Sequence, residues 1–242
     1  LDHAGILEDI FPEINQMRDV TQGPYHHLDV WKHSLHSLQQ CEKFFDEISS
    51  PAHKLYAVAR KLFSYRPGDV SYPGLIKIAE LFHDIGKPEM KKIDPDGKIY
   101  FWEHDQKGKA MVEDIFHRLT CSNEQIESLK KLVAGHLYPA FLLDAKDAKE
   151  QAWIRFFRKM GRDALGVIFL SIGDRRATGG PLAAVRRGKA LAGEFIRRDR
   201  RAAIRFERAK RRLHLLAPEL LNLLAIGHFL RFFADEPVNE LG

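Results

Sequence analysis

Six side chains of the kinds that bind divalent cations are spread widely along this chain of 242 residues. They are four histidines and two aspartates: His33, His83, Asp84, His104, His136 and Asp174. Tens of residues separate all but the adjacent pair, which is too far for a local metal-binding loop. The sequence therefore predicts a metal site whose ligands are brought together only by the fold.

The adjacent pair His83-Asp84 is the sharpest part of this pattern. It ends an apolar-periodic stretch and is followed by Gly86 and Pro88, which are typical of a helix end. Successive helical side chains point about 100° apart, so the pair cannot share one surface stripe. The two side chains can, however, straddle an ion placed beyond the end of the helix.

The remaining four residues complete two expected sites. A first ion would be held by the pair together with His33 and Asp174. A second ion would be held by His104 and His136 and bridged to the first by Asp84. In a site with a single ion, these last two histidines would instead contact the substrate or support the ligands.

Mixed nitrogen and oxygen ligands favour manganese, iron, nickel or cobalt, and magnesium is also admitted. One or two such ions lower the pKa of bound water and clamp the oxygens of a displacement at phosphorus. The pattern thus favours hydrolysis of phosphate esters, with Asp84 as a catalytic residue. Lys87 is the second catalytic candidate, because it could neutralise charge on a phosphoryl oxygen. Alternatively, Lys87 interacts with the carbonyls that end its helix.

Composition sets the broad class of the protein. A hydrophobic content of 45% in 242 residues supports one folded domain, or one domain with a helical tail, and excludes disordered and fibrous classes. Two cysteines without metal or redox spacing indicate a reducing cytoplasm. No signal peptide or long apolar span is present, so no membrane partner is expected. Because residue 1 is leucine, we expect part of a longer protein.

Positive charge is concentrated near the carboxyl end. The net charge is +5, yet residues 186–212 alone hold twelve Lys or Arg against three Asp or Glu. Such a segment could bind the phosphate backbone of RNA, or it could be the solvated face of an amphipathic helix. The candidate RNA-binding residues are Arg197, Arg198, Arg200 and Arg201.

The sequence pattern predicts helix for nearly every segment of the chain. Helical periodicity and capping residues predict helices over 29–45, 51–63, 72–85, 105–119, 122–136 and 162–178. A turn at Asp96-Gly97 between β-favouring flanks predicts a hairpin near residues 92–101. The expected fold class is all-α, a helical bundle with a small β-hairpin insertion.

Four separate segments also carry a family resemblance. They are Tyr25–Leu35, Leu81–Pro88, Phe101–His104 and Leu132–Pro139. In this order they resemble the HD-superfamily metal-dependent phosphohydrolase domain, and most closely the HD domain of bacterial tRNA nucleotidyltransferases and poly(A) polymerases. The resemblance divides the chain into an HD domain at residues 1–180 and a basic helical extension at residues 181–242.

The resemblance implies activity on nucleotides or RNA ends, as a phosphomonoesterase or 2′,3′-cyclic phosphodiesterase. It also implies tRNA as a partner and an upstream nucleotidyltransferase domain. A second hypothesis is a non-catalytic, metal-stabilised module that binds and positions RNA for that domain. A third, hydrolysis of a guanosine polyphosphate, rests on the superfamily alone. Nucleotide addition by this chain is not expected, because its Asp94-Pro-Asp96 lies in the hairpin turn and follows no Gly-Ser pair.

Overall fold

The computed structural model describes residues 2, 4–23, 26–53, 55–144 and 150–179. Helices make up most of its regular structure: α1 Ile6–Ile10, α2 Val30–Ile48, α3 Tyr56–Ser64, α4 Tyr72–Phe82, α5 Lys87–Met90, α6 His104–Arg118, α7 Asn123–Gly135, α8 Tyr138–Asp144, α9 Glu150–Met160 and α10 Ala164–Ala177. Two 3₁₀ turns, Pro12–Met17 and Gly161–Asp163, precede the first expected helix and α10. The predicted all-α bundle with one small hairpin is confirmed.

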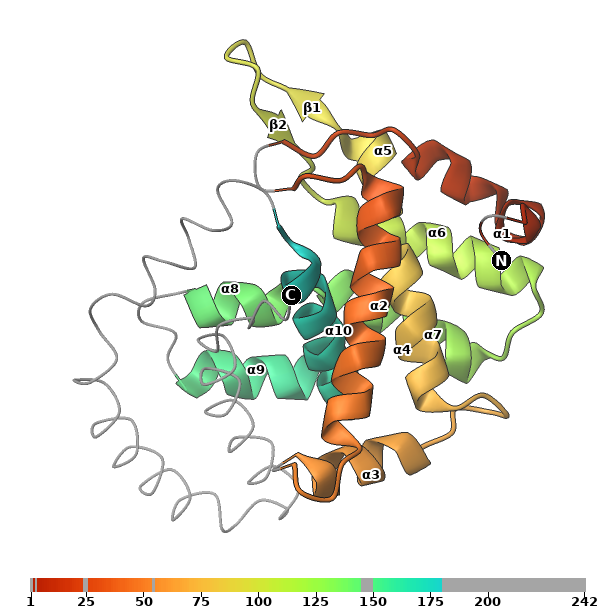
Figure 1. The fold of residues 1–242 in the computed structure, drawn as a ribbon, viewed down its shortest axis with the longest axis vertical. Helices are drawn as coiled ribbons and strands as arrows, with labels where there is room; N and C mark the ends of the chain where they lie inside the picture. Colours follow the sequence, from red (N-terminus) through yellow and green to blue (C-terminus); the bar gives the residue numbers. More distant parts are fainter. Residues whose placement is uncertain (1, 3, 24–25, 54, 145–149, 180–242) are drawn as a thin grey trace, which may run out of the picture.

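Helix α2 runs through the middle of the bundle (Figure 1). It packs most extensively against α10 and α4, while α4 and α6 both pack on α7. Aromatic rings fill the interface between α2 and α10, where Phe44 meets Phe169 edge to face at 5.2 Å. Fully burying a side chain of this kind contributes about 1.5–3 kcal/mol. This core fixes the relative positions of the helices that carry the six candidate ligands.

Two of the helix starts were well specified by the sequence. The Asp29 side chain accepts a hydrogen bond from the Lys32 backbone N–H at 2.8 Å, which fixes the start of α2. Ser122 and Gln125 form a reciprocal capping box at the start of α7. The predicted helices that begin near residues 29 and 122 are therefore confirmed.

Three sequence predictions are corrected. The helix expected from residue 51 begins at Tyr56, because Leu55 donates its backbone N–H to His53 Nδ1 and forms a local turn instead. Helix α8 was not among the predicted helices. Pro139 is its second residue, a position where proline is tolerated. Helix α9 was also missed, although Trp153, Phe156, Phe157 and Met160 bury one face of it.

The chain turns sharply after α4. The helix ends at Phe82, so His83 and Asp84 follow directly at its carboxyl end, as predicted. A Cβ atom on Gly86 would lie 2.2 Å from the His104 carbonyl oxygen. Only glycine therefore permits this turn to pack against the start of α6. The close approach brings the His83-Asp84 pair beside His104.

The predicted hairpin is confirmed and projects from one end of the bundle (Figure 1). Strand β1, Lys92–Ile93, pairs antiparallel with β2, Ile99–Tyr100. Asp94 closes the turn by accepting hydrogen bonds from the Lys98 backbone N–H and the Tyr100 hydroxyl. The Asp94-Pro-Asp96 segment is thus a turn.

Among the described residues, no helix has the length and apolar character needed to cross a membrane. The proposed carboxyl-terminal extension, residues 181–242, lies outside the described residues. The same is true of its RNA-binding candidates Arg197, Arg198, Arg200 and Arg201.

Candidate metal centre

The fold brings all six candidate ligands together. They come from α2 (His33), the carboxyl end of α4 (His83 and Asp84), the start of α6 (His104), the end of α7 (His136) and α10 (Asp174). Asp84 lies at the centre, and each of its oxygens faces a different group of histidines. The side chains that are tens of residues apart in the sequence thus form one compact cluster.

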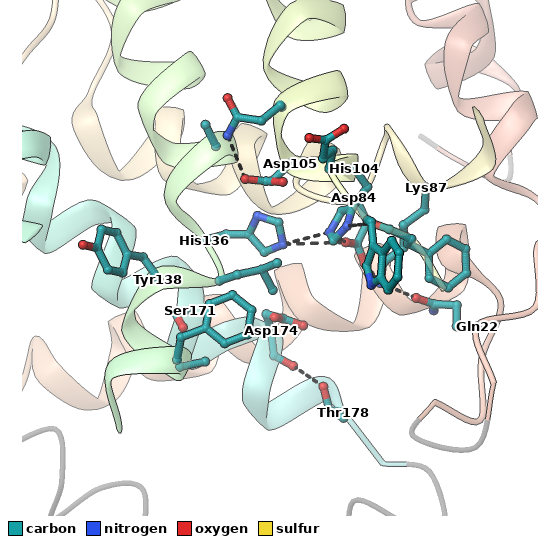
Figure 2. Close-up of a pocket in the computed structure, with 18 of the residues that line it drawn as sticks. Gln22, Asp84, Lys87, His104, Asp105, His136, Tyr138, Ser171, Asp174 and Thr178 are labelled. Atoms are coloured by element: carbon teal, nitrogen blue, oxygen red, sulfur yellow. Dashed lines mark hydrogen bonds and ion pairs between the residues drawn. The ribbon is translucent and has the colours of Figure 1, made fainter. Parts of the chain in front are cut away.

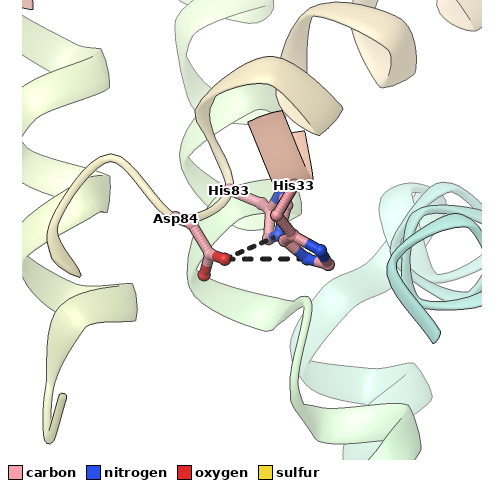
Figure 3. A group of neighbouring side chains, drawn as sticks. All are labelled: His33, His83 and Asp84. Atoms are coloured by element: carbon pink, nitrogen blue, oxygen red, sulfur yellow. Dashed lines mark ion pairs between the residues drawn. The ribbon is translucent and has the colours of Figure 1, made fainter. Parts of the chain in front are cut away.

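The first group surrounds Oδ2 of Asp84 (Figure 3). The possible ligand atoms of His33, His83 and Asp84 all lie within 4.8 Å of one another. Asp174 joins this group, because its Oδ1 is 2.9 Å from His33 Nε2 and 3.8 Å from His83 Nε2. Two imidazoles and two carboxylates therefore face a common point.

The second group surrounds Oδ1 of Asp84 (Figure 2). His104 Nε2 lies 3.2 Å and His136 Nε2 3.8 Å from this oxygen. The two imidazole nitrogens are 3.4 Å apart, and the three possible ligand atoms lie within 4.8 Å of one another. Asp84 has the bridging position that two neighbouring ions would require.

Three of the histidines are oriented by the same local contact. Their Nδ1 atoms bond backbone carbonyls three residues earlier: His83 to Glu80 at 2.8 Å, His104 to Phe101 at 2.7 Å and His136 to Val133 at 2.7 Å. A carbonyl oxygen only accepts, so Nδ1 carries the proton and Nε2 can present its lone pair to an ion. This donor set fits a divalent transition ion.

Charge at the centre is balanced internally. Burial alone would lower the pKa of His83, but the carboxylates of Asp84 and Asp174 outweigh it and raise that pKa to about 9. Burial opposes ionisation of the two aspartates as well. The positive charges of His83 and Lys87 nevertheless hold the pKa of Asp84 well below its usual range, and the hydrogen bond from His33, with the charge of His83, lowers the pKa of Asp174. Burial, with the positive charge of His83, lowers the pKa of His136 to about 3. The positive charges of His83 and Lys87 thus balance the negative charges of the two aspartates.

Lys87 points into the same centre. Its Nζ lies 2.6 Å from Asp84 Oδ2 and 2.6 Å from Gln22 Oε1, and its side chain is buried. The ammonium group also lies over the ring of Phe101 at 5.4 Å. The lysine therefore contributes its charge to the cluster.

Sequence reasoning gave no role to His26, although it lies within the Tyr25–Leu35 segment. Its ring packs edge to face on that of His33 with centroids 4.6 Å apart. Burial, aided by the charge of Lys87, lowers the pKa of His26 to about 3, so it is a neutral imidazole. The ring of the neighbouring His27 packs against Gly179. A Cβ atom added to Gly179 would lie only 2.8 Å from this ring.

A cavity of about 690 Å³ opens onto the cluster. Asp84, His104, His136 and Asp174 line it, as do the residues after the hairpin and those of α8 (Figure 2). A volume of this size is typical of sites for small organic ligands. The candidate metal centre is therefore accessible to a molecule larger than a phosphate ion.

Comparison with curated proteins relates the chain to tRNA nucleotidyltransferases. It is 30% identical over 182 residues to the A-adding tRNA nucleotidyltransferase of Deinococcus radiodurans, covering 75% of this chain and 35% of that protein. It is 27% identical over 181 residues to the CC-adding tRNA nucleotidyltransferase of Thermus thermophilus, covering 74% and 35%. The multifunctional CCA protein of Teredinibacter turnerae is 26% identical over 152 residues, covering 60% and 29%.

The chain spans about a third of the length of these relatives. No protein-family model matches the sequence. The relationship to tRNA nucleotidyltransferases therefore holds for the aligned part alone.

Proposed function

We propose that this chain is a divalent-metal-dependent phosphohydrolase of the HD type that acts on nucleotides or RNA ends. The observation that carries this proposal is the convergence of four histidines on the two oxygens of the buried Asp84, beside Asp174. Relatives that act on tRNA support RNA as the substrate class and tRNA as a partner. The proposal includes an upstream nucleotidyltransferase domain, since the chain spans only about a third of the length of these relatives.

The residues would divide the work as follows. His33, His83, Asp84 and Asp174 would hold one ion, and His104, His136 and Asp84 a second. Manganese, iron, nickel or cobalt suits these ligands best, and magnesium is also admitted. Such ions supply Lewis-acid polarisation of a phosphoryl oxygen and lower the pKa of water toward neutrality. Lys87, fixed between Asp84 and Gln22, would neutralise negative charge that builds on the phosphoryl group.

A substrate panel tests this function. We expect the purified protein, supplied with manganese, nickel or cobalt, to open 2′,3′-cyclic AMP or to release phosphate from nucleoside monophosphates. Hydrolysis should stop when a chelator removes the ion and should return when the ion is restored. Protein that binds the metal but hydrolyses no member of the panel would contradict the proposal.

That outcome would favour the alternative of a non-catalytic module. In such a module the ion would hold α2, α4, α6, α7 and α10 together, and the chain would position RNA for a nucleotidyltransferase. The chain covers only about a third of the length of these relatives, and this observation favours the alternative of a module within a larger protein. Metal removal would then lower the free energy of unfolding and the affinity for tRNA.

Metal affinity should depend on pH through His83. Since its pKa is raised to about 9, the imidazole is protonated below that pH and must lose its proton before it can bind an ion. We expect the association constant for Mn²⁺ to rise about tenfold per pH unit between pH 6 and 8 and to level off above about 9. Calorimetry in buffers of different ionisation enthalpy should detect about one proton released per ion at pH 7.

The exposed His117 on α6 provides a matched control. His117→Gln should leave the affinity for Mn²⁺ and its pH dependence unchanged. If wild-type protein bound Mn²⁺ with the same affinity at pH 6 and pH 8, His83 would not be a ligand.

A further inference from the structure

Two large aromatic side chains are exposed at the mouth of the cavity. Trp102 is 71% exposed and Phe141 is 63% exposed, and both line the cavity. Within the described residues, all other Trp, Phe and Tyr side chains are at least partly buried. Single exposed apolar residues are ordinary, but two large rings at one ligand-sized opening indicate a binding surface.

The backbone around Trp102 is bent in a way that costs free energy. Glu103 adopts φ +63°, a left-handed conformation that non-glycine residues rarely accept. The next residue, His104, is buried in the metal centre, whereas Trp102 stays exposed. The strained turn thus separates a ring that faces solvent from an imidazole that faces Asp84, and such strain is common where binding sites are built.

Further aromatic side chains lie at the same cavity. Trp102 packs against Tyr100 of β2 with centroids 5.4 Å apart and a 43° interplanar angle. On the α8 side, Tyr138 packs on Phe156 and lies under the ammonium group of Lys159. Both Tyr100 and Tyr138 line the cavity as well. The cavity is therefore lined both by acidic and imidazole groups of the cluster and by aromatic side chains.

We propose that Trp102, with Phe141, forms a stacking platform for the nucleobase of the substrate. This inference rests on the proposed function, which places the phosphate beside Asp84. A phosphate group alone would fill little of a 690 Å³ cavity, so the remaining volume needs an organic group. Aromatic walls fit a flat, uncharged ring, and any nucleobase offers a π-face for stacking. The platform makes the site selective for nucleotides over simple sugar phosphates.

The positions of the three tryptophans permit a direct test. Trp31 and Trp153 are 1% and 6% exposed, so Trp102 is the one tryptophan that a ligand in solution can reach. We would titrate chelator-treated protein with adenosine 5′-monophosphate and with ribose 5-phosphate, in which a hydroxyl group replaces the base. Adenosine 5′-monophosphate should quench tryptophan fluorescence and bind about fivefold to a hundredfold more tightly than ribose 5-phosphate, the range that stacking on an aromatic ring supplies.

Variants separate stacking from general damage. Trp102→Ala should reduce the ratio of the two affinities toward one, and Trp102→Phe should keep most of the ratio while losing the fluorescence change. Ile93→Ala removes a comparably exposed apolar side chain from the preceding hairpin, outside the cavity lining, and should keep both the affinity ratio and the fluorescence change. Equal affinities for the two ligands in wild-type protein, no binding of adenosine 5′-monophosphate, or an unchanged ratio in Trp102→Ala would each overturn the platform.

The result is distinguishable from failure of the proposed function, because the titration requires no turnover. Hydrolysis of phosphoesters without preference for the base would support the phosphohydrolase function and refute the stacking role of Trp102. Base-dependent quenching of tryptophan fluorescence without hydrolysis of any phosphoester would support the stacking role of Trp102 and refute the phosphohydrolase function.

Discussion

Replacing Asp84 with asparagine should lower both Mn²⁺ affinity and phosphoester hydrolysis by at least about a hundredfold. Asparagine matches the size of aspartate but carries no charge. An NH₂ group, which can only donate hydrogen bonds, replaces one of the two carboxylate oxygens. Both oxygens of Asp84 face imidazole nitrogens, at 3.1 Å from His83 and 3.2 Å from His104. Either orientation of the amide therefore removes a ligand from one of the two groups.

Loss of folding must be distinguished from loss of the ion. In Asp84→Asn the buried Lys87 loses its ionic partner, which in comparable buried pairs costs about 3–5 kcal/mol. The double variant Asp84→Asn/Lys87→Met removes both charges and should regain much of this stability without regaining metal binding. Circular dichroism and urea unfolding would follow folding, and calorimetry would follow the ion.

Asp163 provides a control of matched burial. This aspartate is 2% exposed, accepts a hydrogen bond from the Tyr72 hydroxyl at 3.0 Å and pairs with Lys131. It lies at the opposite end of α10 from Asp174, roughly 16 Å away at 1.5 Å per residue. Asp163→Asn should lower stability by about 1–3 kcal/mol and leave Mn²⁺ affinity intact. Wild-type metal affinity and activity in Asp84→Asn would refute the central role of this residue.

The elements that carry part of the cluster could be predicted from local signals in the sequence. The His83-Asp84 pair stands at a helix end that Gly86 and Pro88 mark, and side-chain caps mark the starts of α2 and α7. The expected grouping of His33 with Asp174, and of His104 with His136 about Asp84, matches the geometry. Whether these residues bind ions stays a prediction.

Features that depend on packing were not visible in the sequence. The role of Gly86 comes from the approach of the His104 backbone, which no local pattern encodes. The contact of His26 with His33 likewise needs the three-dimensional course of the chain before α2. Helix α9 did carry a signal, because Trp153, Phe156, Phe157 and Met160 have helical spacing. Its omission was an error of interpretation.

The second large effect concerns Glu80, a fully buried acid one turn before His83. Its carboxylate accepts a hydrogen bond from the Ser37 hydroxyl, and Gly173 of α10 packs against its other oxygen so closely that a Cβ atom would not fit. Burial raises the pKa of Glu80 from its ordinary 4.5 to about 8, although the positive charge of His83 opposes the shift. The native protein therefore binds this proton more tightly than the unfolded chain does.

The sign of the pH effect follows from this difference. The stabilising contribution of the proton is complete below about pH 4.5 and is lost as the pH rises to about 8. At about 1.4 kcal/mol per pKa unit, ionisation of Glu80 should cost the wild-type protein on the order of 4–5 kcal/mol by pH 9. Glu80→Gln keeps an acceptor for Ser37 but cannot ionise. Its stability relative to wild type should therefore rise by about that amount between pH 5 and pH 9.

Urea unfolding at pH 5, 7 and 9 with a chelator present would measure this difference, since a bound ion would change the charge of His83. Glu42→Gln is the matched control, because Glu42 forms an exposed pair with Lys77 and does not lie in the core. Its stability relative to wild type should not change over the same range. If Glu80→Gln and wild type lost stability in parallel between pH 5 and pH 9, Glu80 would be ionised in the native core at all three pH values. Its charge would then be balanced by His83, and the cluster would extend one helical turn into the bundle.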